Sequence, residues 1–320
     1  MKPRFFAAPT ALLFVATAWV SSASAQPVRL RYNWTQGDVL TYRTVVRTNT
    51  SIAGGPAGTN SFEQTMGQTL KVTVAAVAPD GTATLRQVIE AVSLEMNTPG
   101  GKVAYDSTKP PGADADPRVK SMQKAMGAMV GEAISVMMAA NGAVRRIDGT
   151  ARIVDKLMAD LPRDPMAGSL AQNIKAMLSE DALRSSLEQN FSRMPDAPVK
   201  PGDTWTAEQS VGADSVGKIV GKSTFTLKGI EGTGDAAMAR IGVTLALRQQ
   251  NVPSAGASVV MKLGDGKGEG ELLFHVAKGR VERNTMRTDI ASSATMRGPD
   301  GGTATLQNST RTQMTMDLVK

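Results

Sequence analysis

Cysteine is absent from this 320-residue sequence, and histidine occurs only once. Without cysteine the chain has neither a thiol nucleophile nor a disulfide, and a zinc site of the usual His/Cys type lacks ligands. A lipoprotein signal also needs a cysteine, so lipid attachment by that route is excluded. We therefore expect a protein that is stable without cross-links and that uses no cofactor.

The single histidine, His275, could serve as the base of a serine triad. It lies in the alternating stretch ELLFHVAKG, and no G-x-S-x-G motif supplies a serine nucleophile. A phosphate-binding G-x-x-x-x-G-K-[ST] loop is also missing. We interpret His275 as a strand residue without a catalytic role, and we predict no catalytic residue in the chain.

Aromatic residues make up only 4% of the sequence, although clefts that bind sugars are usually lined with them. Three carboxylates, Asp155, Asp160 and Asp164, could still provide the pair that a glycoside hydrolase requires. They lie on or just after a short helix whose other face is apolar, which is typical of a solvated surface. A carboxylate-dependent hydrolase is therefore kept as the alternative to a non-enzymatic protein.

The first 25 residues have the pattern of a cleaved signal peptide. Lys2 and Arg4 precede an apolar run over residues 5–20, and Ala23-Ser24-Ala25 provides the small residues that signal peptidase recognises. The run is shorter than the roughly 20 residues that a membrane span needs. For a bacterial source, this predicts cleavage between Ala25 and Gln26, a periplasmic or secreted protein, and no membrane span in the mature chain.

The charge balance of the chain is mildly basic. Lysine and arginine number 36 against 29 acidic residues, and removing the leader lowers the net charge from +7 to +5. No basic block with interleaved aromatic residues is present, so we expect no nucleic-acid partner.

Strand patterns dominate residues 26–320. Apolar residues alternate with other residues in four stretches, which places each apolar set on one face of a sheet. The four sets are Val28, Leu30, Tyr32 and Trp34; Leu70, Val72 and Val74; Val92, Leu94 and Met96; and Ile241, Val243, Leu245 and Leu247. Turn signals at residues 79–81, 141–142 and 277–279 separate such stretches. Sheets with one solvated face are typically antiparallel.

Helical patterns interrupt these strands over residues 151–192. Ile153, Leu157 and Leu161 recur every fourth residue, and Ser179 followed by two acids predicts a capped helix that runs to Pro195. The sequence thus predicts one α+β domain over residues 26–320. In it, a curved antiparallel sheet packs against a central block of short helices.

Similar features recur in the same order in residues 26–150 and 195–320. TQGDVLTY and KPGDTWTA each place an aromatic residue after a Gly-Asp turn, and SVMMAANGAVRR and LLFHVAKGRVER share a glycine turn followed by Val and a basic residue. One interpretation is a duplication of the sheet; the other is that hairpins resemble one another for physical reasons alone.

The stretches QGDVLTYR, PDAPVKPGDTW and GEGELLFHVAKGRVE resemble exported bacterial proteins of domain-of-unknown-function family 6263. The similarity covers most of residues 26–320. It implies no known activity, so no site residue is carried over from the family.

Methionine is unusually frequent, with 18 residues against seven phenylalanines. Three interpretations remain open: bulk for the core, an adaptable apolar binding surface, or copper(I) binding through thioethers. The residues concerned are Met122, Met126, Met129, Met137, Met138, Met314 and Met316.

Two further stretches suggest a site. LGDGKGEGE holds Asp265, Glu269 and Glu271, but it lacks the spacing of a calcium loop, so a flexible hairpin connection is expected there. PVKPGDTWTA is interpreted as a turn that leads Trp205 into a strand, buried against the helices. The leading hypothesis is a non-enzymatic protein of the bacterial envelope. Its partner would be either lipid or another apolar ligand, bound between the sheet and the helices, or a second envelope protein.

Overall fold

The computed structural model describes residues 26–55, 58–98, 101–109, 126–160, 175, 178–213, 217–250, 259–297 and 302–319. The predicted leader, residues 1–25, lies outside these ranges, as do residues 110–125.

The secondary structure of the described residues is mainly β-strand. The first half holds β1 (Val39–Gly55), β2 (Gly58–Val77), β3 (Ala83–Thr98), β4 (Gly101–Asp106), β5 (Ala133–Met138) and β6 (Val144–Asp148). Two helices follow, α2 (Thr150–Asp160) and α4 (Glu180–Phe191). The second half holds β7 (Thr204–Ala213), β8 (Gly217–Glu231), β9 (Met238–Gln249), β10 (Val259–Leu263), β11 (Gly266–His275), β12 (Arg280–Arg297) and β13 (Thr303–Leu318), with a 3-10 turn at Gly234–Ala236.

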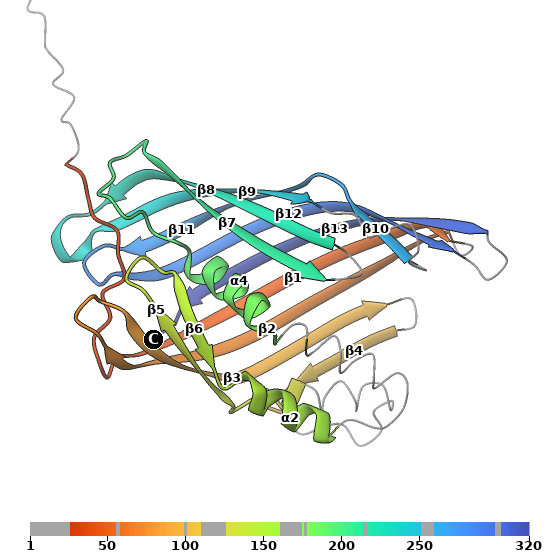
Figure 1. The fold of residues 1–320 in the computed structure, drawn as a ribbon, viewed down its shortest axis with the longest axis horizontal. Coiled ribbons are helices and arrows are strands. Elements are labelled where there is room, and N and C mark those ends of the chain that lie inside the picture. Colours follow the sequence, from red (N-terminus) through yellow and green to blue (C-terminus); the bar gives the residue numbers. More distant parts are fainter. Residues whose placement is uncertain are drawn as a thin grey trace, which may run out of the picture.

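Within the described ranges, these strands form one antiparallel sheet in the order β6-β5-β3-β2-β1-β13-β12-β11-β9-β8-β7, with β4 on β3 and β10 on β12. The first and last strands along the chain pair with each other, from Tyr42 opposite Leu318 to Ala53 opposite Gln307. The sheet curves into a trough, and α4 lies across it between β6 and β7 (Figure 1). The predicted α+β class with a curved antiparallel sheet is therefore confirmed, although the described part of the helical block is small.

The local sequence explains where α4 begins and how it packs. The Ser179 side chain accepts a hydrogen bond from the Ala182 N–H at 3.3 Å, and Glu180 and Asp181 place negative charge at the helix N-terminus. Leu187 and Phe191 are buried on the face toward the sheet. The predicted cap of this helix is thus confirmed, and the helix ends at Phe191, before Pro195.

Helix α4 also forms hydrogen bonds with both edge strands of the sheet, β6 and β7. On β6, the Val144 N–H donates to Glu188 Oε1 at 3.1 Å, and Arg184 donates to the Val144 carbonyl. On β7, Gln209 Oε1 accepts from the Ser185 hydroxyl at 3.2 Å. The helix therefore satisfies main-chain groups of an edge strand that would otherwise need another strand or water.

The segment before β1 differs from its prediction. Leu30, Tyr32 and Trp34 are buried as the alternation predicts, but residues 29–35 are extended chain rather than strand, and only Val28 forms an isolated bridge, with Val199. The segment crosses one end of the trough (Figure 1). Alternation predicts which side chains face the core, whereas strand pairing needs a neighbouring edge along the whole segment.

Tyr32 holds this segment against the exit of α4. Its ring stacks on Trp34 at a centroid distance of 5.3 Å, and its hydroxyl donates to the Ser192 carbonyl at 3.2 Å. Burial raises the pKa of Tyr32 well above its usual value, because the anion would lose its hydration.

The two Gly-Asp turns make the same three main-chain hydrogen bonds. In each turn, the glycine N–H donates to the second strand that follows, that strand donates back to the aspartate carbonyl, and the aspartate N–H donates to the residue three positions earlier. The first set is Gly37 N to Val74 O, Val74 N to Asp38 O and Asp38 N to Thr35 O; the second is Gly202 N to Leu227 O, Leu227 N to Asp203 O and Asp203 N to Lys200 O. This shared geometry agrees with the resemblance between the halves, while their common ancestry stays a prediction.

Candidate functional site

A hollow of about 290 Å³ lies between α4 and the concave face of the sheet. We call it the α4 hollow. Its wall is mainly apolar and comes from β8, β9 and β12: Phe225, Val243, Leu245, Leu247, Met286 and Ile290. Its polar lining comes from α4 and the neighbouring strands: Ser185, Glu188, Gln189, Gln209, Ser223 and Thr288. An apolar wall with a few polar groups at one side is the usual composition of a small-molecule site.

Glycines leave space at the sheet side of the α4 hollow, because they have no side chain to fill it. Gly221 of β8 lines it, and on β11 Gly266, Gly268 and Gly270 lie opposite Leu247, Leu245 and Val243 of β9. A Cβ at Gly266 would lie 2.8 Å from Leu247 Cβ, and one at Gly268 would lie 3.2 Å from Leu245 Cβ. The contact at Gly266 is closer than real Cβ atoms come, and the contact at Gly268 is tighter than most, so a larger residue at either position would force Leu247 or Leu245 to shift.

The same stretch corrects one prediction. Residues 266–271 were expected to form a flexible hairpin connection, but they belong to strand β11. Glycine and charge alternate along it, so that Lys267 and Glu269 are exposed on the face opposite the glycines. Composition alone predicts a loop here, whereas the packing of β9 against the glycines makes it a strand. Among the described residues, no group of three histidine, aspartate or glutamate side chains is placed to hold a metal ion.

Methionines continue the apolar surface away from the hollow. Met286 of β12 lies opposite Met314 of β13, which lies opposite Val46 of β1, and Val46 lies opposite Met66 of β2. Met138 and Met316, by contrast, are fully enclosed in the core. The structure therefore places methionines both in the core and along the concave face; Met122 lies outside the described residues.

The proposed catalytic candidates do not come together in the described residues. His275 is buried, and its Nδ1 accepts a hydrogen bond from the Lys278 N–H at 3.3 Å, as a structural histidine would. Asp155 is exposed on α2, the Asp160 side chain is not described, and Asp164 lies outside the described residues. The hydrolase alternative therefore stays a prediction without a described site.

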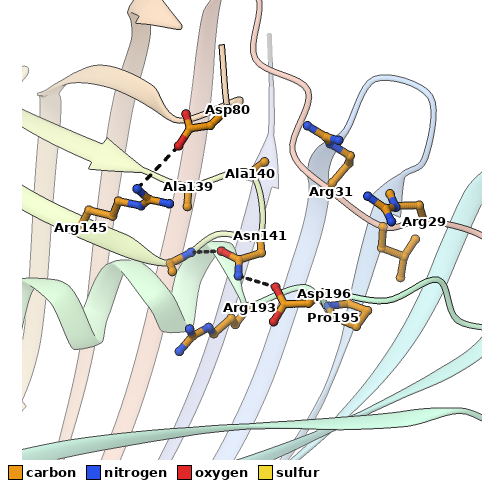
Figure 2. A pocket seen from close by; sticks show the side chains of 12 residues that line it. Arg29, Arg31, Asp80, Ala139, Ala140, Asn141, Arg145, Arg193, Pro195 and Asp196 are labelled. Carbon is orange, nitrogen blue, oxygen red and sulfur yellow. Dashed lines mark hydrogen bonds and ion pairs between the residues drawn. The ribbon is translucent and has the colours of Figure 1, made fainter. Parts of the chain in front are cut away.

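A second cavity, of about 420 Å³, lies at the end of the trough crossed by the N-terminal segment. We call it the arginine pocket; Figure 2 shows the residues that line it, among them Arg29, Arg31, Arg145 and Arg193 together with Asp80 and Asp196. This pocket cannot be recognised from the sequence, because its arginines come from segments far apart in the chain. Their one local signal is that Arg29 and Arg31 alternate with buried residues.

The two aspartates of the arginine pocket both accept hydrogen bonds from neighbouring groups. Asp80 accepts hydrogen bonds from the Thr82 N–H and hydroxyl, both at 2.9 Å, and these bonds lower the pKa of its carboxyl group. Asp196 accepts a hydrogen bond from Asn141 Nδ2 at 2.9 Å. Arg145 lies 3.6 Å from Asp80, and both side chains are more than half exposed, so this ion pair is weak.

In the part of the chain that the structure describes, no helix is long and apolar enough to cross a membrane.

Comparison with known proteins identifies a family but no activity. The model of a family of unknown function, DUF6263, matches residues 80–273, over half of the chain. No curated protein matches. Among solved structures, a lipovitellin studied for its lipid–protein interactions is 9% identical with a TM-score of 0.41, and the match covers 89% of this chain but only 25% of the lipovitellin chain. DynF, from the dynemicin biosynthesis pathway of Micromonospora chersina, is 9% identical with a TM-score of 0.21 over 97% of this chain and 92% of its own.

Proposed function

The chain belongs to the DUF6263 family of unknown function, and we propose from its geometry that it is an exported, non-enzymatic protein that binds an apolar ligand, such as a lipid acyl chain, in the α4 hollow. The observation that carries this proposal is a space beside the apolar wall under α4 that no side chain of the described residues fills.

The shape of the hollow favours a small ligand over a protein partner. It lies beneath a helix rather than on an open surface, and about 290 Å³ is close to the lower limit of known small-molecule pockets. An acyl chain would cover Leu245, Leu247 and Met286, and each buried methylene would contribute about 0.8 kcal/mol.

Movement of α4 could admit such a ligand without unpairing the sheet. Polar contacts from Arg184, Ser185 and Glu188 hold the helix to β6 and β7, while Leu187 and Phe191 anchor its C-terminal half in the core. The N-terminal half of α4 is held by the polar contacts of Arg184 and Ser185 and by the partly buried Leu183, but it has no fully buried side chain. It therefore has the weaker attachment and would move first.

The pattern of residues 1–25 supports export, and periplasmic or secreted location is part of the proposal. A carrier of apolar ligands would be useful in an aqueous compartment, where free lipid is poorly soluble.

The proposal is tested with the neutral fluorophore N-phenyl-1-naphthylamine and a pair of matched variants. Ser223→Phe adds bulk inside the hollow, whereas Lys222→Phe adds the same group on the exposed face of the same strand. We expect saturable binding to the natural protein, at least tenfold weaker binding to Ser223→Phe, and a change of less than twofold for Lys222→Phe.

Equal effects of both substitutions, or no saturable binding to the natural protein, would overturn the proposal. Native mass spectrometry of protein purified from its own cell envelope gives a second readout. Co-purifying lipid that is lost in Ser223→Phe supports the proposal, and a clean apo mass for the natural protein contradicts it.

A further inference from the structure

The arginine pocket holds more positive charge than its own carboxylates can neutralise. It contains four arginines and two aspartates, and both aspartates already accept hydrogen bonds from Thr82 or Asn141. Arg29, Arg31 and Arg193 are exposed, and among the described residues none of the three forms an ion pair. Figure 2 shows an interaction for Arg145 but none for these three side chains.

The walls of this pocket are held in place by main-chain hydrogen bonds between distant segments. The Tyr32 N–H donates to the Ala140 carbonyl at 2.7 Å, and the Met194 N–H donates to the Asn141 carbonyl at 2.8 Å. The Asn141 side chain accepts from the Ala143 N–H at 3.1 Å and donates to Asp196. The backbones that carry Arg31 and Arg193 are thus fixed to the β5–β6 turn before any ligand arrives, which reduces the ordering cost of binding.

We propose that the arginine pocket is an anion-binding site that takes a phosphate group, either free or as part of a lipid headgroup. Guanidinium groups match the oxygens of phosphate with paired hydrogen bonds, and arginine holds its charge at every physiological pH. The cavity of about 420 Å³ has room for such a group. This site is separate from the α4 hollow, and the proposal does not depend on what the hollow binds.

A pair of triple variants with equal charge tests the proposal. Arg29→Gln, Arg31→Gln and Arg193→Gln together remove the unpaired charges of the pocket. Arg43→Gln, Arg86→Gln and Arg248→Gln together remove three exposed arginines from β1, β3 and β9, which likewise form no ion pair among the described residues. Both variants lower the net charge by three, so nonspecific electrostatic attraction falls equally in the two. Thermal unfolding verifies that both remain folded.

Isothermal titration calorimetry with inorganic phosphate at low salt gives the main readout. We expect one saturable site in the natural protein, at least tenfold weaker binding in the pocket variant, and a change of less than threefold in the control. Binding should weaken as ionic strength rises, because exposed charges are screened.

Flotation with phosphatidylglycerol vesicles, compared with phosphatidylcholine vesicles, distinguishes the two sources of phosphate. Flotation with phosphatidylglycerol that inorganic phosphate competes away indicates a lipid headgroup; phosphate binding without flotation indicates a free phosphate compound. The proposal is overturned if the natural protein binds neither probe, or if the two triple variants lose affinity to the same extent.

Discussion

At the scale of single residues, Trp205 carries two separate interactions at the start of β7. Its Nε1 donates to the Arg193 carbonyl at 2.7 Å, and its ring stacks on Phe225 at a centroid distance of 5.6 Å. It was expected to be buried against the helices; instead it is half-buried and holds the segment that follows α4. Trp205→Ala should therefore lower the free energy of unfolding by roughly 3 kcal/mol, at the lower end of the range for aromatic truncation.

Trp205→Phe separates the two contributions. It keeps a stacked ring and loses the hydrogen bond to Arg193, so we expect a loss of about 1 kcal/mol. Urea denaturation followed by circular dichroism measures both variants. Unchanged stability of the alanine variant would show that the residue is not structural.

At the scale of elements, the first turn of α4 depends on its cap. Ser179→Ala removes the acceptor for the Ala182 N–H and should lower the free energy of unfolding by about 1 kcal/mol. Ser179→Asp retains an acceptor of similar quality and should stay close to the natural protein. Urea denaturation tests both, and an equal loss in the two variants would contradict a capping role.

The strands and turns show which elements can be predicted from local sequence and which cannot. The turn at Asn141-Gly142 was recognised because the pair of residues favours a hairpin, and it connects β5 to β6 as expected. The glycine-rich first part of β11 was predicted wrongly as a loop, and the segment before β1 was predicted wrongly as a strand, whereas the second part of β11 up to His275 was predicted correctly. In both cases the neighbouring chain decided the outcome: β9 and β12 pair with the glycine-rich stretch, and none of the described strands pairs with residues 29–35.

At the scale of the whole molecule, pairing of β1 with β13 makes the two halves one sheet. We therefore expect the halves to unfold together, in agreement with the single domain predicted for residues 26–320. Once the predicted leader with Trp19 is removed, one tryptophan remains in each half, Trp34 and Trp205. Fluorescence of the single-tryptophan variants Trp34→Phe and Trp205→Phe should show urea midpoints that coincide with circular dichroism of the same variant. Separate midpoints for the two probes within either variant would indicate two domains.

Acid should destabilise the whole molecule. Hydrogen bonds from the Thr108 hydroxyl and N–H, followed by one from Lys109, lower the pKa of Asp106 to about 2, and neighbouring groups also lower the pKa of Asp80, Glu132 and Asp289. A carboxyl group whose pKa is lower in the folded state stabilises the fold above its unfolded pKa, and this stabilisation is lost as the pH falls toward the folded value. We expect the melting temperature to decrease between about pH 4 and pH 2.

Asp106→Asn provides the control for this acid dependence. It removes the carboxyl group that holds its proton least tightly, so the decrease below about pH 4 should be shallower than in the natural protein. An identical decrease in thermal scans of the two proteins would show that Asp106 does not contribute.

The sequence by itself determined the strand faces, the turns and the start of α4. Leu245 and Leu247 were assigned to one face of a strand, and that face lines the α4 hollow. Periodicity and capping are properties of a few consecutive residues, so they can be recognised without knowledge of the fold.

Only the tertiary structure decided which faces meet. It placed β1 beside β13, laid α4 across the trough, and brought Arg29, Arg31 and Arg193 to one pocket from segments more than 160 residues apart. These arrangements depend on the curvature of the complete sheet and on pairing between distant strands, and no local pattern encodes either of them. Both candidate sites arise from such arrangements, because each lies where elements that are distant in the chain come together.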